Sequence, residues 1–314
     1  MSPTRALVEA SLLVSLAVVL FAASHYLPVV GLLVSLVCPA PLVVLGLRHD
    51  LKRALLGTFT ATLLTAALLG VVTSLFFLLG FGILGIGLGY LARRCKSGSE
   101  VILYGLVISL ASKLALMAIL IKMTGMNPFS LDGAALEESL DGVVRLYGTV
   151  GLPTQSLEAM REQFRSMVAL LPRIFPTLLV MASAMDCFLS YVISGAIVRR
   201  LGGFSLPPLP AFSQWRFPKS VFWALLASMG LQLLGPSLGE FAVEAGLNLR
   251  LLVSMLFFFQ GLSVVWFYLV SRKMVAPLRY AVVFLLAFVP FLSQIVLVLG
   301  VVDIWYDLRN RLRR

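Results

Sequence analysis

Charged residues are scarce in this sequence: only 12% are Asp, Glu, Lys or Arg, and the 14 acids are outnumbered by 25 bases. Soluble domains carry about 25% charged residues, so a chain of this composition would be insoluble in water. No polar stretch is long enough to form a separate soluble domain. The formal net charge of +11 would suggest a nucleic-acid partner if the protein were soluble. However, no basic patch is interleaved with exposed aromatic residues, so we expect no nucleic-acid partner.

Cysteine and histidine are also scarce. The three cysteines, Cys38, Cys95 and Cys187, lie in different segments without a Cys-x-x-Cys spacing, which argues against a disulfide framework or a zinc site. The two histidines, His25 and His49, fall on opposite sides of the membrane in the topology predicted below, so they cannot form a metal site or a catalytic dyad. The sequence contains neither a His-Glu-x-x-His motif nor a Walker loop. We therefore expect no enzyme, no metal and no cofactor.

Apolar residues, by contrast, make up 60% of the chain, and the mean hydropathy is +1.00. Several apolar stretches exceed the ~18–20 residues that cross a ~30 Å hydrocarbon core. Short basic clusters separate these stretches, and Lys and Arg beside a span stay in the cytoplasm. The clusters are Arg48, Lys52 and Arg53; Arg93, Arg94 and Lys96; Arg199, Arg200, Arg216 and Lys219; Arg272, Lys273 and Arg279; and Arg309, Arg311, Arg313 and Arg314. The pattern predicts an all-α, polytopic bundle in one integral membrane domain over 1–314, with an uncleaved first span and a cytoplasmic N-terminus.

We predict eight full spans and a broken C-terminal hydrophobic segment. The spans are expected at about 6–26, 29–46, 54–71, 74–92, 101–122, 167–198, 220–236 and 250–270. The last apolar stretch, 280–302, has Pro290 near its middle, and we favour a bent or re-entrant ending with the tail inside over a ninth full span. Residues 125–166 form the longest polar stretch, and their acidic balance agrees with an external loop. An amphipathic helix from Thr154 to Arg165 is expected in this loop, where it would act as a lid over a ligand.

Three features inside the spans are candidates for ligand binding. Pro39 and Pro41 interrupt the second span and mark either a substrate cavity or a simple kink, because freed backbone carbonyls need protein or water beside them. Asp186 in the sixth span and Lys113 in the fifth are costly in lipid, and we expect them to form an ion pair. Gln260 lies in the eighth span. These polar residues either bind a ligand or only orient the bundle through interhelical hydrogen bonds.

Glycines crowd the fourth span, and Gly82, Gly85 and Gly89 share one face of the expected helix. A glycine face lets a neighbouring helix backbone approach closely. The face serves either ordinary helix packing inside the protein or a sliding or docking surface for a partner.

The order of these features resembles the YybS-like family, uncharacterised multi-pass membrane proteins of bacteria, over nearly the whole chain. The resemblance rests on Pro39-Ala40-Pro41, the glycine-rich fourth span, the segment from Pro207 to Pro218, Gly261-Leu262-Ser263, and the ending from Leu299 to Arg309. The N-terminal part of that family is similar to the S components of energy-coupling-factor vitamin transporters. These helical bundles bind a small molecule near the outer face and work with a transmembrane coupling protein and ATPases. The resemblance implies an S-component-like core over 1–198, C-terminal helices and a basic tail over 199–314, and a place in the bacterial inner (plasma) membrane.

Two functions are therefore weighed. The first is binding and uptake of an unknown small molecule, with energy supplied by separate partners because the chain carries no ATPase. The second is a membrane scaffold or regulator without transport activity, which would hold partners through the loop around Trp215 and the basic tail. A lipid-modifying enzyme is a third hypothesis, and no catalytic constellation in the sequence supports it.

Overall fold

The computed structural model describes residues 3–27, 30–125, 142, 154–202 and 205–309. Every regular element within these ranges is helical, which confirms the all-α class. The chain divides into two compact units. Unit 1 contains residues 1–131 and 178–209, and unit 2 contains residues 132–177 and 210–314. The predicted partition at residue 198 stays a prediction.

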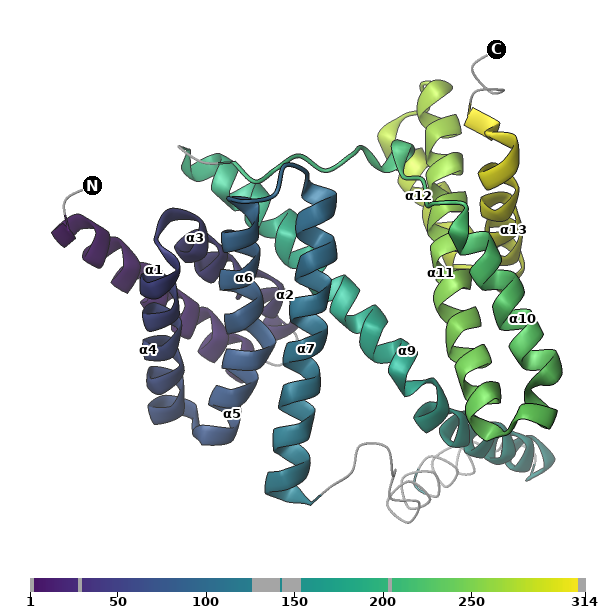
Figure 1. Cartoon of the computed structure of the whole chain (residues 1–314), viewed down its shortest axis with the longest axis horizontal. Helices are drawn as coiled ribbons and strands as arrows, with labels where there is room; N and C mark the ends of the chain where they lie inside the picture. Colours follow the sequence, from purple (N-terminus) through teal and green to yellow (C-terminus); the bar gives the residue numbers. More distant parts are fainter. Residues whose placement is uncertain (1–2, 28–29, 126–141, 143–153, 203–204, 310–314) are drawn as a thin grey trace. The chain divides into compact units, whose positions relative to one another are not determined.

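Unit 1 is built from the N-terminal helices and the second half of α9 (Figure 1). Its elements are α1 (Pro3–Tyr26), α2 (Val30–Val37), α3 (Ala40–Arg48), α4 (Leu51–Leu69), α5 (Val71–Leu75), the π-helix η1 (Phe76–Gly82), α6 (Ile83–Ala92) and α7 (Gly98–Thr124). The 48-residue helix α9 (Thr154–Leu201) contains Pro172 and Pro176 and runs through the division between the units. It begins at Thr154, where the amphipathic helix was predicted. Most of the predicted external loop lies outside the described residues, so its role as a lid stays a prediction.

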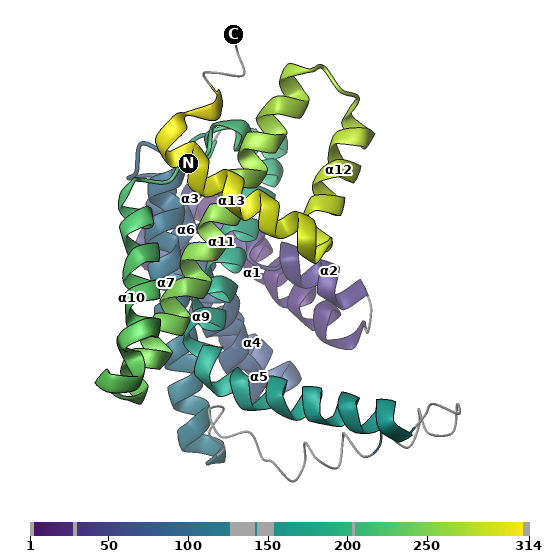
Figure 2. The ribbon, with the colours of Figure 1, turned by 90° about the vertical axis from the view of Figure 1, so that its right-hand side faces the viewer.

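Unit 2 contains the C-terminal helices. Its elements are the short turn η2 (Phe212–Gln214), α10 (Ser220–Leu238), α11 (Glu240–Ser271), α12 (Ala276–Phe288) and α13 (Pro290–Tyr306). α12 and α13 meet at a bend of 99° at Val289 and Pro290, which confirms the broken ending (Figure 2). α11 and α13 approach closely where Gly261 and Gly300 lack side chains: a Cβ at Gly300 would lie 2.9 Å from the backbone nitrogen of Gly261.

The prediction of eight full spans is wrong. Five helices in the described part of the chain are long and apolar enough to cross a membrane, or six if the bent pair α12–α13 counts as one span. The five are Thr4–Tyr26, Val71–Ala92, Gly98–Thr124, Gln155–Leu201 and Glu240–Ser271. The predicted second span is split at Pro39, the third (α4) carries Lys52, Arg53 and several threonines, and the apolar part of the seventh is only Ser220–Gly235.

The helix α3 explains why the second predicted span falls short. Eight of its nine residues, Ala40 to Leu47, are buried among α1, α4 and α6. A helix that is apolar on every face is one that is buried on every side. α6 packs closely on it because Gly85 and Gly89 face α3, and a Cβ at Gly85 would lie 2.7 Å from the Cβ of Leu42. The apolarity of α3 therefore serves burial inside unit 1, whereas the third glycine of this face, Gly82, lies against Thr58 of α4.

Candidate functional site

A small cavity in unit 1 lies where two irregular helical segments meet α9. Its volume is about 130 Å³, and its lining includes Ser35, Pro39, Gly80, Phe81, Asp186 and Ser190. Ser35 and Pro39 come from the end of α2 and the break before α3, Gly80 and Phe81 come from the π-helix η1, and Asp186 and Ser190 come from α9. Two segments that depart from α-helical geometry and one carboxylate thus face the same space.

Asp186 forms an ion pair with Lys113, the lysine predicted from the sequence to be its partner. The Nζ atom of Lys113 on α7 lies 2.5 Å from Oδ2 of Asp186 on α9, and it also donates to Oγ of Ser109 at 2.9 Å. The expected ion pair is therefore present. The Lys113 side chain is 18% exposed and the Asp186 side chain 49% exposed, so the carboxylate is the more accessible partner. Pairing offsets the cost of placing either charge among apolar helices.

A local contact between α7 and α9 lies beside this pair. Gly105 of α7 lies against Cys187 of α9, and a Cβ at Gly105 would lie 2.7 Å from the Cys187 Sγ atom. The Cys187 thiol donates to the backbone carbonyl of Ile102 at 3.4 Å. The neighbour of Asp186 in the sequence thus anchors α9 to α7, and this contact sets the position of the carboxylate.

The helix is interrupted between α2 and α3 by two prolines. Pro39 and Pro41 have no N–H group, so they cannot donate to the carbonyls of Ser35 and Val37, as an uninterrupted helix would require. The N–H of Cys38 instead donates to the carbonyls of Val34 and Ser35, both at 3.2 Å. Pro39 lines the cavity, whereas Pro41 lies in the buried helix α3. The structure shows both a break in the helix and a small cavity beside Pro39, and the role of this cavity as a substrate site stays a prediction.

The π-helix η1 supplies the second irregularity. π-helical turns are rare, and they occur frequently at functional sites. Here Gly80 and Phe81 of η1 line the cavity opposite α9. A second signal therefore points to the same place as the Pro39 break.

Gln260 does not belong to this group. It lies in unit 2, where it is 1% exposed. Its Nε2 atom donates to Oδ2 of Asp303 at 3.1 Å, and its Oε1 atom accepts from the N–H of Phe217 at 3.2 Å. Gln260 is thus occupied by bonds inside unit 2, while Pro39, Asp186 and Lys113 are brought together in unit 1. The ligand-binding role assigned to all of these residues stays a prediction.

Sequence reasoning overlooked a buried polar cluster in unit 2, centred on Arg309. Its Nη1 atom donates to the carbonyl of Ser213 and its Nη2 atom to the carbonyl of Trp215, both at 2.7 Å. Nη2 also donates to Oγ of Ser263 at 3.1 Å and lies 3.6 Å from Oδ2 of Asp303. Burial lowers the pKa of the Arg309 guanidinium, and the negative charge of Asp303 opposes that shift. Asp303, directly after the last apolar stretch, was the available signal.

The expectation that no Gly-x-Ser-x-Gly pattern occurs in the chain is wrong, because residues 235–239 form one, but its setting differs from that of a nucleophile elbow. A nucleophile elbow of this type requires a turn from a strand to a helix. Here the pattern forms the end of α10, and the Ser237 hydroxyl donates to the carbonyl of Leu234 at 2.7 Å. Gly239 has a φ of +104°, as expected for a glycine that ends a helix. Nor, among the described residues, do three His, Cys, Asp or Glu side chains gather closely enough to hold a metal ion.

Comparison with known proteins agrees with the helical membrane architecture. An uncharacterised protein, YybS of Bacillus subtilis (strain 168), is 28% identical over 318 residues, and the match covers 100% of both chains. No solved structure matches the chain significantly. A family described as "Predicted membrane protein (DUF2232)" matches residues 15–304, which is nearly the whole chain. The resemblance to the YybS-like family is thereby confirmed, and the chain belongs to this family of predicted membrane proteins.

Proposed function

We propose that the chain binds a small polar molecule in the cavity of unit 1 and takes part in its uptake into a bacterial cell. The observation that carries the proposal is the meeting of the Asp186–Lys113 ion pair, the Pro39 break and the π-helix at one cavity. Ionisable residues inside membrane helices are rare and often mark substrate or ion pathways, which supports a functional role for this pair. In this proposal the chain performs no chemistry of its own, and a separate transmembrane coupling protein with ATPases supplies the energy.

The size of the cavity requires that a segment moves. A volume of about 130 Å³ corresponds to roughly four water molecules. Pockets for small molecules are usually about 300 Å³ or more. The segment best placed to move is α2, because it has only eight residues, ends at the Pro39 break, and exposes Leu33 on its outer side. Outward movement of α2 would enlarge the cavity without unfolding the buried helix α3.

The ion pair indicates what the ligand must offer. Separating Lys113 from Asp186 leaves two charges without partners in a poor solvent, which costs several kcal/mol as an order of magnitude. A ligand that enters between them must replace the lost contacts with charged or strongly polar groups. The half-exposed carboxylate of Asp186 is the group that the ligand meets first.

The proposed orientation places the N-terminus and the basic loops in the cytoplasm. Within unit 1, the bonds of Arg48 and Arg93 support a common side for the basic loops near 48–53, 93–96 and 199–202. The Nη1 atom of Arg48 lies 2.5 Å from Oε1 of Glu9, and its Nη2 atom donates to the carbonyl of Gly202 at 3.2 Å. Arg93 donates to the carbonyl of His49 at 2.8 Å. The start of α1 and these three loops therefore lie at one end of the unit, as the positive-inside rule requires.

A binding screen tests the proposal directly. The full-length protein in lipid nanodiscs would be exposed to a panel of water-soluble vitamins and amino acids, and binding would be followed by native mass spectrometry. We expect at least one member to bind the wild type and to bind Asp186→Asn about ten-fold or more weakly, because one charged contact is lost. Asp50→Asn is the matched control, since Asp50 is 58% exposed and pairs only with its neighbour Arg53 within the described residues. Equal binding to Asp186→Asn, or no binding across the panel, would contradict the proposal.

A membrane scaffold remains the second candidate, and one observation favours it. The loop before α10 is held to α11 by Ser263, whose hydroxyl donates to the carbonyl of Phe212 at 2.5 Å. Two bonds from Arg309 hold the same loop to the segment that follows α13. A loop fixed in this way presents a constant surface to a partner. If unit 1 binds no member of the panel, co-purification of a protein that depends on Trp215 would support the scaffold.

A further inference from the structure

Unit 2 has a groove that neither the family match nor the proposed function accounts for. It has a volume of about 480 Å³ and lies between α10, α11 and α13. Its polar lining residues are Arg250, Ser254, Ser293 and Gln294. The remaining lining residues are Leu, Met and Phe, and none is acidic. The groove therefore combines one positive charge with apolar walls.

Arg250 is positioned to bind an anion. Its Nη1 atom donates to Oε1 of Gln232 at 2.6 Å, which holds the head group in place. The other guanidinium N–H groups have no bond to another described residue. Arg250 is exposed and lies at the beginning of the span expected at 250–270, where an arginine side chain reaches the level of the lipid headgroups and their phosphates.

Two further donors face the same groove. The hydroxyl of Ser254 and the side-chain amide of Gln294 both line it, whereas the hydroxyl of Ser293 is already donated to the carbonyl of Pro290 at 2.8 Å. A guanidinium, a hydroxyl and an amide are the groups that proteins use to bind phosphate oxygens.

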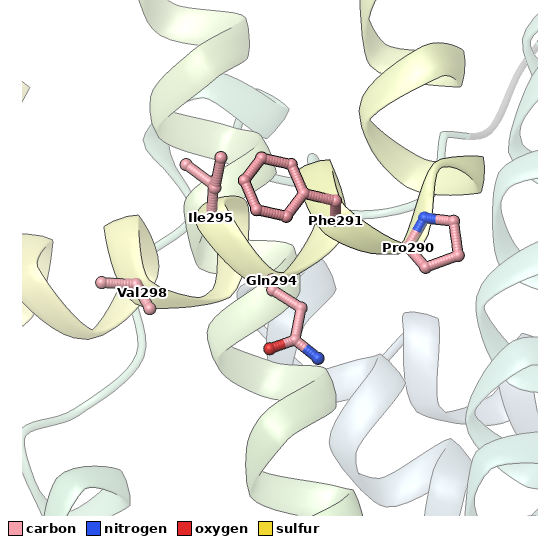
Figure 3. Close-up of a pocket in the computed structure, with 5 residues that line it drawn as sticks. All are labelled: Pro290, Phe291, Gln294, Ile295 and Val298. Carbon is pink, nitrogen blue, oxygen red and sulfur yellow. The ribbon is translucent and has the colours of Figure 1, made fainter.

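The apolar surface continues beyond Gln294. A second depression of about 470 Å³ shares Gln294 with the groove and follows α13 from Pro290 to Val298 (Figure 3). Figure 3 shows the amide of Gln294 pointing away from the apolar side chains of Phe291 and Ile295. An acyl chain beside α13 would therefore meet apolar side chains up to the bend at Pro290.

We propose that this groove binds an anionic phospholipid, with the phosphate at Arg250 and an acyl chain along the apolar walls. Charge complementarity favours an anion, and the apolar walls favour a lipid over a soluble phosphate, which would leave them uncovered. The lipid would seal the space between α10, α11 and α13.

The test uses the full-length protein, purified in detergent and titrated with phosphatidylglycerol or phosphatidylcholine, with bound lipid counted by native mass spectrometry. We expect the wild type to prefer phosphatidylglycerol, and Arg250→Gln to weaken its binding by about five-fold or more, since one basic residue contributes about that factor near anionic lipid. Arg250→Lys should restore most of the preference. The matched control is Arg272→Gln, because Arg272 ends α11 outside the groove and stacks on Tyr268.

A second variant tests the contribution of the apolar groove independently of the charge of Arg250. Leu297→Trp fills the groove without changing any charge, and we expect it to reduce phosphatidylglycerol binding as well. Millimolar glycerol 3-phosphate should not compete with the lipid. The inference is overturned if folded Arg250→Gln or Leu297→Trp retains phosphatidylglycerol like the wild type, if phosphatidylcholine binds equally well, or if glycerol 3-phosphate displaces the lipid.

Discussion

Replacing Arg309 by methionine should destabilise unit 2 by about 3–5 kcal/mol, because the change leaves the carboxylate of Asp303 buried without its cation. The two side chains are 5% and 1% exposed, so water screens neither of them. Methionine keeps much of the apolar volume of arginine but none of its donors. The two backbone carbonyls that Arg309 reaches at 2.7 Å would also lose their donor.

The second half of the experiment removes the other charge. Asp303→Asn alone should cost less, about 1–2 kcal/mol, because its side-chain oxygen can still accept the N–H of Leu308, which donates to Asp303 at 3.1 Å. The double variant should lose less than the sum of the two single losses, by about 1–2 kcal/mol or more, because it contains neither the cation nor the carboxylate and leaves no unpaired charge. A positive coupling of this kind is the signature of a buried ion pair.

Tryptophan fluorescence provides the assay. All four tryptophans, at positions 215, 223, 266 and 305, belong to unit 2, so their emission during unfolding in detergent reports this unit and not unit 1. The matched control is Arg272→Met, which removes an exposed arginine stacked on Tyr268 and should cost about 1 kcal/mol at most. If Arg309→Met is as mild as this control, or if the two losses add strictly, Arg309 and Asp303 do not act as a buried pair.

Three further predictions concern unit 1, the helix contacts of unit 2 and the topology. Lys113→Met and Asp186→Asn should each lower stability in detergent by about 1–3 kcal/mol, with a double loss smaller than the sum; strict additivity in a thermal melt would refute their pairing. Gly300→Ala should destabilise by about 2 kcal/mol or more because its Cβ would enter the backbone of α11, whereas Gly230→Ala, with open space around it, should be neutral or stabilising in the same unfolding assay. Single cysteines placed in 199–219 should resist an impermeant thiol reagent in intact cells, and labelling from outside would show that this loop is not cytoplasmic.

Some features of the protein follow from local chemistry and were accessible in the sequence. The helical class follows from long apolar stretches, because a chain in lipid must satisfy its backbone hydrogen bonds within itself. The bend at Pro290 follows from the missing proline N–H. The pairing of Lys113 with Asp186 follows from the cost of an isolated charge in an apolar span. Each inference required only the residue and its immediate surroundings.

The number of spans was not accessible in this way. Hydropathy measures how apolar a segment is, and it does not distinguish a helix surrounded by lipid from a helix surrounded by protein. α3 is apolar because α1, α4 and α6 enclose it, so the sequence alone made it look like part of a full span.

The same distinction between local chemistry and tertiary packing applies to the candidate sites. The sequence by itself determined that the chain is a helical membrane protein, where its last segment bends, and which charges need partners. Only the tertiary structure decided that Pro39, the π-helix and Asp186 share one cavity, that Gln260 belongs with Asp303, and that Arg309 binds a loop 96 residues before it in the chain. Hydrophobic periodicity and proline act over a few residues, whereas a cavity or a buried ion pair depends on which helices pack together, and packing is a property of the whole fold.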